Sequence, residues 1–150
     1  MNIATWHADW VWGLPLIVLN VVIHVLCLGT INARIVARAS QRVNPVGVTA
    51  LFVAGAALMA TILHAIEGTV WAVAYLGLGA LPDLRTAMLY SLSAITSYGH
   101  AQIFLDPQWQ LLGALEALNG VILFGLTTAF LFGLIQKIWP LGSRVSGGGD

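Results

Sequence analysis

The chain has 150 residues, of which 59% are hydrophobic and 8% are charged, and its formal net charge is zero. Because soluble globular domains carry about 25% charged residues, a soluble fold of this size could hardly cover its surface. The composition therefore indicates an integral membrane protein in contact with the lipid bilayer, and the zero net charge argues against nucleic acid as a partner. We expect no soluble regulatory domain, because apolar segments occupy most of the chain.

Long uncharged stretches locate the predicted transmembrane helices. A helix needs about 20 residues to cross the hydrocarbon core of a bilayer. Reading the uncharged windows in chain order predicts helices at about 11–31, 46–80 and 108–138. The second is longer than one crossing requires, so we expect it to tilt or to project into solvent.

A further uncharged segment, residues 86–105, is too polar for an ordinary membrane span. It contains the run "SLSAITSYGHAQ", in which half of the side chains are polar. Pro82-Asp83 supplies a helix start, with Asp83 able to cap the free N–H groups, and Gly99 supplies a turn. Membranes accept non-helical backbone only where protein buries it or where it lines a water-filled cavity. The sequence therefore predicts a short helix at 83–96, a turn and a cavity.

Basic residues decide between a complete crossing and a re-entrant segment. Arg34, Arg38 and Arg42 lie between the first two helices, and Lys137 and Arg144 follow the last one. Basic loops stay in the cytoplasm. Both groups are cytoplasmic only if residues 86–105 enter and leave the membrane on one side. The positions of the basic residues thus favour a re-entrant segment, with the N-terminus outside and the C-terminus in the cytoplasm.

The order helix, re-entrant helix, turn and helix resembles the pore of tetrameric potassium channels over about 46–138. Pores of that family read roughly S-x-x-T-x-T-T-V-G-Y-G-D, and Ser91 to Gln102 aligns with this pattern without a gap. Thr96-Ser97 then stands at the family's Thr-Thr, and Tyr98-Gly99-His100-Ala101 stands at Val-Gly-Tyr-Gly. A rival alignment places Tyr98-Gly99 on the family's Tyr-Gly and needs a two-residue deletion. The later segment "GVILFGLTTAFLF" resembles the channel inner helix.

The resemblance implies an all-α integral membrane fold with three transmembrane helices plus a re-entrant pore helix and filter loop per chain, assembled as a homotetrameric pore. Residues 1–45 would hold an N-terminal segment, an extra transmembrane helix and a cytoplasmic basic loop. Residues 46–138 would form the pore module, and 139–150 a disordered cytoplasmic tail. Within the module the resemblance implies the outer helix 46–80, pore helix 83–96, filter 97–101 and inner helix 108–138. The expected location is the cell inner (plasma) membrane, crossed several times.

The function that this resemblance implies is passive conduction of monovalent cations, with K⁺ the first expectation and Na⁺ left open, rather than an enzyme activity. It requires no cofactor other than the conducted ion. The implied ion-binding residues of the filter are Thr96, Ser97, Tyr98, Gly99, His100 and Ala101. The implied residues of the cavity and gate are Gly120, at the family's hinge glycine, with Thr127 and Thr128. His100-Ala101 departs from the family's Tyr-Gly, so a non-conducting or regulatory membrane subunit with a collapsed filter is the alternative.

Four ionisable residues at membrane depth need an interpretation as well, because such groups are expensive in lipid. His64 and Glu67 share one helix face and form either a pH-sensing pair or a packing pair. Their spacing suits a metal, but the sequence offers no further convergent ligands, so no metal site is predicted. His24 is either a packing residue or, with His64, a haem ligand as in membrane cytochromes. Glu116 either bonds the back of the short helix or lines the outer pore.

Overall fold

The computed structural model describes residues 3–39, 46–99 and 103–138, and side-chain surroundings from His7 onward. Within these residues the chain is helical and contains no strand. The long helices are α1 (Ile3–Ala39), α2 (Val46–Gly77) and α4 (Gln110–Ile138), and the short helix α3 (Leu84–Ile95) lies between α2 and α4 in the sequence. The expected tail 139–150 lies outside the described residues.

The helices α1, α2 and α4 are each long and apolar enough to cross a membrane, which confirms the predicted spans. Many large apolar side chains on their outer faces are exposed, as helices in lipid require. Helix α1 begins earlier and ends later than the predicted 11–31. Its extension to Ala39 is rich in alanine and arginine, which are good helix formers.

Helix α2 ends at Gly77, three residues before the predicted end, because a glycine-based cap terminates it. Gly79 has a φ of 65°, in the left-handed region that favours glycine. Its N–H donates to Leu76 O at 3.0 Å, and the N–H of Ala80 donates to Tyr75 O at 2.9 Å. These two bonds are the Schellman pattern, which satisfies carbonyls left free at a helix end.

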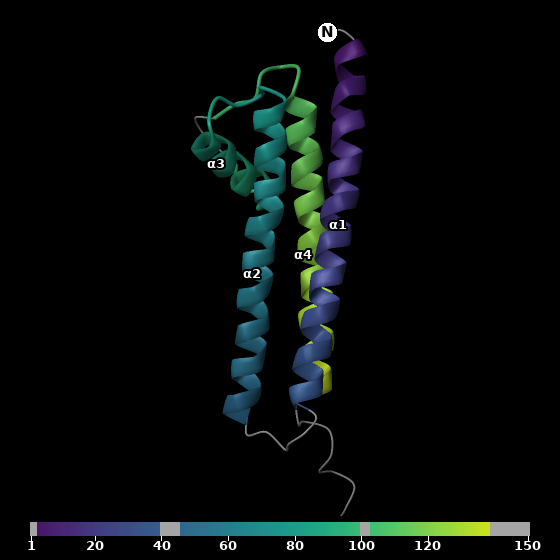
Figure 1. Ribbon diagram of the computed structural model, residues 1–150, viewed down its shortest axis with the longest axis vertical. Coiled ribbons are helices and arrows are strands. Elements are labelled where there is room, and N and C mark those ends of the chain that lie inside the picture. Colours follow the sequence, from purple (N-terminus) through teal and green to yellow (C-terminus); the bar gives the residue numbers. More distant parts are fainter. Residues whose placement is uncertain (1–2, 40–45, 100–102, 139–150) are drawn as a thin grey trace, which may run out of the picture.

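The long helices form an up-and-down bundle in which α1 and α4 run in the same direction and α2 runs against them (Figure 1). Helix α3 lies beside the upper part of α2 and α4 and contacts both. At 1.5 Å per residue, its 12 residues extend about 18 Å, well short of the roughly 30 Å hydrocarbon core. The segment between α2 and α4 therefore begins and ends at the same end of the bundle.

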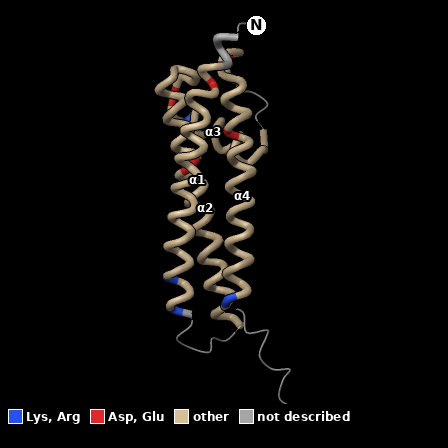
Figure 2. The backbone as a smooth tube through the Cα atoms, turned by 90° about the vertical axis from the view of Figure 1, so that its right-hand side faces the viewer, with Lys and Arg blue, Asp and Glu red and all other residues tan. Residues whose placement is uncertain are grey.

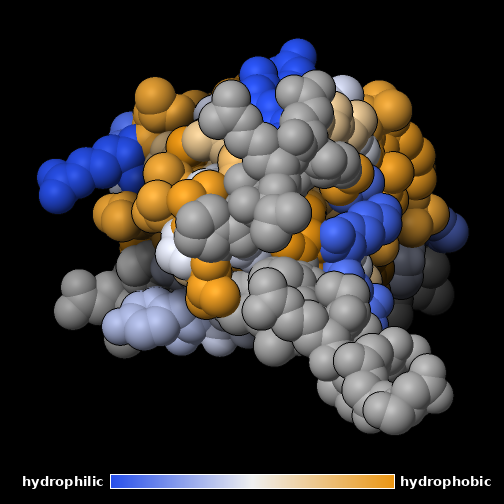
Figure 3. Space-filling view, turned by 90° about the horizontal axis from the view of Figure 1, so that it is seen from below, coloured by the Kyte–Doolittle hydropathy of each residue, from blue (hydrophilic) through white to orange (hydrophobic). Residues whose placement is uncertain are grey.

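Charged side chains are distributed unevenly along the bundle (Figure 2). Of the described basic residues, Arg34 and Arg38 of α1 and Lys137 of α4 lie at the lower end, whereas Arg85 belongs to α3 in the upper part. Acidic residues lie in the upper half. Seen from below, hydrophilic side chains occur at this end beside apolar flanks (Figure 3). The described basic residues near the end of α1 and at the end of α4 thus share one end of the molecule.

Candidate functional site

A local cap built on Asp83 fixes the start of α3. Asp83 has extended backbone, and its Oδ1 accepts a hydrogen bond from the Thr86 N–H at 3.0 Å. Its Oδ2 accepts a second bond from the Thr86 hydroxyl at 2.7 Å. These hydrogen bonds from Thr86 lower the pKa of the Asp83 carboxyl below its usual value. The predicted capping role of Asp83 is confirmed.

The end of α3 is also a Schellman cap, but a serine occupies the left-handed position. The Ser97 N–H donates to Ala94 O and the Tyr98 N–H donates to Ser93 O, both at 2.9 Å. Ser97 has a φ of 55°, and left-handed backbone costs a residue with a Cβ roughly 1–2 kcal/mol. The Gly99 N–H also approaches Ser93 O, at 3.3 Å. The first half of the predicted filter is therefore a tight turn over the end of α3.

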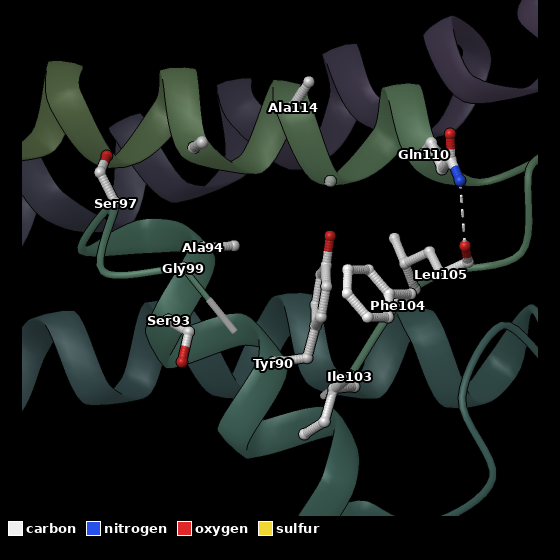
Figure 4. A pocket seen from close by; sticks show the side chains of 12 residues that line it. Tyr90, Ser93, Ala94, Ser97, Gly99, Ile103, Phe104, Leu105, Gln110 and Ala114 are labelled. Carbon is white, nitrogen blue, oxygen red and sulfur yellow. Dashed lines mark hydrogen bonds between the residues drawn. The ribbon is translucent and has the colours of Figure 1, made fainter. Parts of the chain in front are cut away.

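A pocket of about 620 Å³ opens between α3, the segment 103–105 and the first half of α4 (Figure 4). Ser93, Ser97 and Gly99 contribute to its wall at the end of α3. Tyr90 projects from α3 toward α4, and Gln110 donates to Leu105 O at 3.5 Å at the other end. Polar and apolar side chains thus line a concave surface beside the turn.

Glu116 attaches α3 to both of the long helices behind it. The carboxyl group is fully buried, and its Oε2 accepts a hydrogen bond from the Tyr75 hydroxyl at 2.7 Å. Its Oε1 forms a short hydrogen bond with the Ser91 hydroxyl of α3, which also reaches Gly68 O at 2.7 Å. The expectation that Glu116 bonds the back of the short helix is confirmed. We call Tyr75, Ser91 and Glu116 the Glu116 cluster.

Gly120 marks the closest approach of α3 to α4. A Cβ added to Gly120 would lie 2.7 Å from the carbonyl carbon of Ile95 and would collide with its oxygen. Backbone atoms cannot move aside cheaply, so only glycine fits here without displacing the end of α3. The predicted hinge role of Gly120 stays a prediction, whereas the packing role follows from this contact.

A second buried cluster joins α1, α2 and α4 lower in the bundle. Glu67 Oε1 lies 2.8 Å from His24 Nδ1, and Glu67 Oε2 lies 3.1 Å from His64 Nδ1. The Nε2 atoms of both histidines lie 3.1 Å from the Thr127 hydroxyl oxygen. His24 and Glu67 are fully buried, and His64 is 8% exposed. We call these four residues the histidine–glutamate cluster.

The predicted site residues thus fall into three places. Thr96 to Gly99 form the turn beside the pocket, whereas His100 and Ala101 lie outside the described residues. Thr127 belongs to the histidine–glutamate cluster and does not line the pocket. Thr128 is exposed on α4, where its hydroxyl donates to Phe124 O at 2.8 Å.

Sequence reasoning missed that His24 joins the pair on α2. His24 lies 43 residues before Glu67, so no local spacing links them, although its position well inside a predicted span was a signal of a buried partner. The haem interpretation does not fit this arrangement. The ring centroids of His24 and His64 lie only 5.3 Å apart, and both Nε2 atoms are directed at the same hydroxyl. A porphyrin between the two rings would have to displace Thr127.

Comparison with protein-family models, curated proteins and solved structures finds no match for this chain. A functional conclusion therefore depends on the residues and on the geometry of α3, the turn and the two clusters.

Proposed function

We propose that the protein is a membrane cation channel in which the segment between α2 and α4 lines a pore shared by several copies of the chain. The observation that carries this proposal is the short helix α3. It starts and returns at one end of the bundle, and its C-terminal turn lies beside a pocket to which Ser93, Ser97 and Gln110 contribute polar groups. This is the arrangement expected of a re-entrant helix that brings backbone to a water-filled axis.

The electrostatics of α3 favour a cation over an anion at that axis. The C-terminal end of a helix carries a partial negative charge from its free carbonyl groups. Two of the hydroxyl side chains at this end bond to helix carbonyls, Ser93 to Leu89 O at 2.7 Å and Thr96 to Leu92 O at 2.6 Å. The hydroxyl oxygens keep lone pairs that can face an ion. Oxygen groups of this kind replace the water shell of K⁺ or Na⁺ in channel filters.

Two large exposed side chains support assembly of several copies. Tyr98 is 85% exposed and Phe104 is 75% exposed, on either side of the segment proposed to line the pore. One re-entrant segment cannot surround an ion, and closed rotational symmetry would bring further copies of this surface together. We propose a homotetramer, which light scattering with size-exclusion chromatography in detergent tests directly. A monomer or dimer at all protein concentrations would contradict the shared pore.

The proposed orientation follows from the basic end of the bundle. Arg34, Arg38 and Lys137 share the lower end, and basic segments stay in the cytoplasm. The turn at Ser97 then faces the outer half of the membrane, with the N-terminus outside. Labelling of single cysteines placed at the two ends, in a variant in which Cys27 is replaced by serine, tests this orientation in intact cells.

Ion flux in liposomes tests the proposed function. Purified protein in vesicles with K⁺ or Na⁺ gradients should pass ions faster than empty vesicles. Gly99→Ala should reduce this flux, because Gly99 has a φ of 76° and a Cβ there costs roughly 1–2 kcal/mol. Gly29→Ala is the matched control, since a Cβ at this position in α1 meets no atom within 4 Å. Flux equal to that of empty vesicles would refute the channel.

A non-conducting subunit is the second candidate function, and one observation favours it. The N–H groups of Ser97, Tyr98 and Gly99 all turn back toward carbonyls of α3, so this part of the chain is closed on itself. A collapsed filter would leave a membrane protein with the same oligomeric state and no flux. Light scattering and flux measured on one sample therefore separate the two functions.

A further inference from the structure

We infer that the histidine–glutamate cluster is a binding site for one divalent transition-metal ion of the Zn²⁺ class, held by His24, His64 and Glu67. The inference does not depend on the proposed channel function, because the cluster lies away from the pocket at α3. The candidate ligand atoms come from two helices, α1 and α2, and all lie within 4.8 Å of one another. Two imidazoles and one carboxylate are a common protein ligand set for zinc.

The distances in the cluster are close to those that a metal requires. Tetrahedral zinc with bonds of about 2.0–2.1 Å places neighbouring ligand atoms about 3.3 Å apart. Glu67 Oε1 lies 2.8 Å from His24 Nδ1 and Glu67 Oε2 lies 3.1 Å from His64 Nδ1. The three candidate ligand atoms lie within 4.8 Å of one another, so binding one ion requires the side chains to move closer together. Thr127 packs on the far side of both imidazoles, which leaves a fourth coordination position for water.

Two of these atoms lack a hydrogen bond. Among the described residues, His64 Nδ1 and Glu67 Oε2 are buried without a hydrogen-bond partner, although they lie 3.1 Å apart. Their contact has the distance of an ion pair but not the alignment of a hydrogen bond. Buried polar atoms without a partner call for an explanation, and an ion bound between them is one.

Thr127 supports both imidazoles on the side away from Glu67. Its hydroxyl oxygen lies 3.1 Å from the Nε2 atoms of His24 and His64. With a metal at both Nδ1 atoms, each Nε2 carries a proton and donates it to the Thr127 oxygen. Metal-bound histidines commonly donate the other ring N–H to an oxygen in this way.

The buried carboxylate of Glu67 also favours binding of a cation. Glu67 is fully buried in α2. On α1, the first basic residue after His24 is Arg34. At 1.5 Å per residue, Arg34 lies about 15 Å along the helix from His24. An ionised carboxylate buried at this depth is costly unless a cation neutralises its negative charge. A bound dication would do so.

Metal binding by the full-length protein in lipid nanodiscs tests the inference. The sample is stripped with a chelator and titrated with Zn²⁺, and with Co²⁺ as a spectroscopic probe. We expect about one Zn²⁺ per chain, visible Co²⁺ absorption bands of a site with nitrogen ligands, and a higher melting temperature with Zn²⁺. These measurements on the wild-type protein need no variant to fold. A Zn²⁺ content near zero, or no change in melting temperature, would overturn the inference and leave a proton as the cation of the cluster.

Variants then assign the bound metal to these residues. Glu67→Gln should abolish stoichiometric Zn²⁺ binding, and Thr127→Ala should weaken it about 10–100-fold through the lost support of the imidazoles. His7→Asn is the matched control, because His7 is an exposed histidine on α1. Circular dichroism and size-exclusion profiles show whether each variant is folded. Equal Zn²⁺ affinity in folded Glu67→Gln and wild-type protein, or loss of binding in His7→Asn, would place the metal elsewhere and refute the site.

Discussion

The Glu116 cluster gives the sharpest stability prediction, because each of its hydrogen bonds can be removed separately. Glu116→Ala leaves the buried Tyr75 hydroxyl without its acceptor, whereas Ser91 keeps Gly68 O at 2.7 Å. An unsatisfied buried hydroxyl costs about 1–3 kcal/mol. The missing side-chain atoms leave a cavity that adds about 1 kcal/mol. We therefore expect Glu116→Ala to lower the free energy of unfolding by about 2–4 kcal/mol.

A double-mutant cycle isolates the hydrogen bond from the cavity. Tyr75→Phe removes the donor and keeps the ring, so in the Glu116→Ala background it should cost almost nothing. The coupling between the two sites should be about 1–3 kcal/mol, which is typical of contacting residues in one network. Glu116→Gln should be much milder than Glu116→Ala, because an amide can accept from Tyr75 and donate to Ser91.

Equilibrium unfolding in a mild detergent, followed by circular dichroism, measures these free energies. Amide hydrogen exchange of α3 adds a local readout, since the Ser91 contact is the part of the cluster that lies on α3. Tyr90→Phe is the matched control for loss of a tyrosine hydroxyl, because the Tyr90 ring packs edge-on against Tyr75 and its hydroxyl is not among the hydrogen-bond partners of Glu116. Additive effects of Tyr75→Phe and Glu116→Ala would refute the role assigned to this hydrogen bond.

Three further outcomes follow from α3 and its two ends. Gly120→Ala should displace α3 and reduce the hydrogen-exchange protection of its amides, because a Cβ there meets the Ile95 backbone. Gly133→Ala is the control, since no atom lies within 4 Å of an added Cβ at that position. Equal protection in both variants would contradict this packing. Ser97→Gly should raise the free energy of unfolding by about 1 kcal/mol by relieving left-handed strain, and a loss of stability would show that the serine side chain is needed. Because hydrogen bonds from Thr86 lower the pKa of Asp83, its capping contribution should be complete above its usual pKa of 3.8 and should fall as the pH drops through the lowered value. Melting curves between about pH 2 and 6 should show this decline in the wild-type protein but not in Asp83→Asn, and the same decline in both would assign it to other carboxyls.

Local sequence signals predicted the parts of the fold that depend on local chemistry. Uncharged windows located α1, α2 and α4, since burial of charge in lipid is expensive wherever it occurs. Pro82-Asp83 indicated the start of α3, because a cap needs only neighbouring residues. The end of α3 was harder to predict. Its left-handed residue is Ser97 rather than glycine, and the sequence pattern of a Schellman cap is usually read from glycine.

Contacts between helices that are far apart in the sequence could be predicted only in part. The bond between Glu116 and the short helix could be predicted, because the resemblance to channel pores supplied the relative position of α3 and α4. Nothing comparable supplied the position of α1. The convergence of His24 on Glu67 depends on how far α1 is shifted along α2 and on how it is rotated, and apolar faces that resemble one another at every turn do not specify these quantities.

The two buried clusters together explain how the helices acquire one relative position in lipid. Apolar contact alone drives little association between helices in a membrane, so close packing and hydrogen bonds must specify the arrangement. Glu116 joins α4 to α2 and α3, which positions the short helix and its turn. Glu67 and Thr127 join α2 and α4 to His24 of α1. Helix α1 also packs against α4, where Gly13 lies close to Leu112 and Leu115, and Asn20 of α1 donates to Glu67 O at 3.5 Å. Loss of the cluster should therefore loosen α1 at mid-bundle while the contact of α3 with Glu116 persists, and cross-linking of cysteine pairs between α1 and α4 in the Glu67→Gln variant would reveal this.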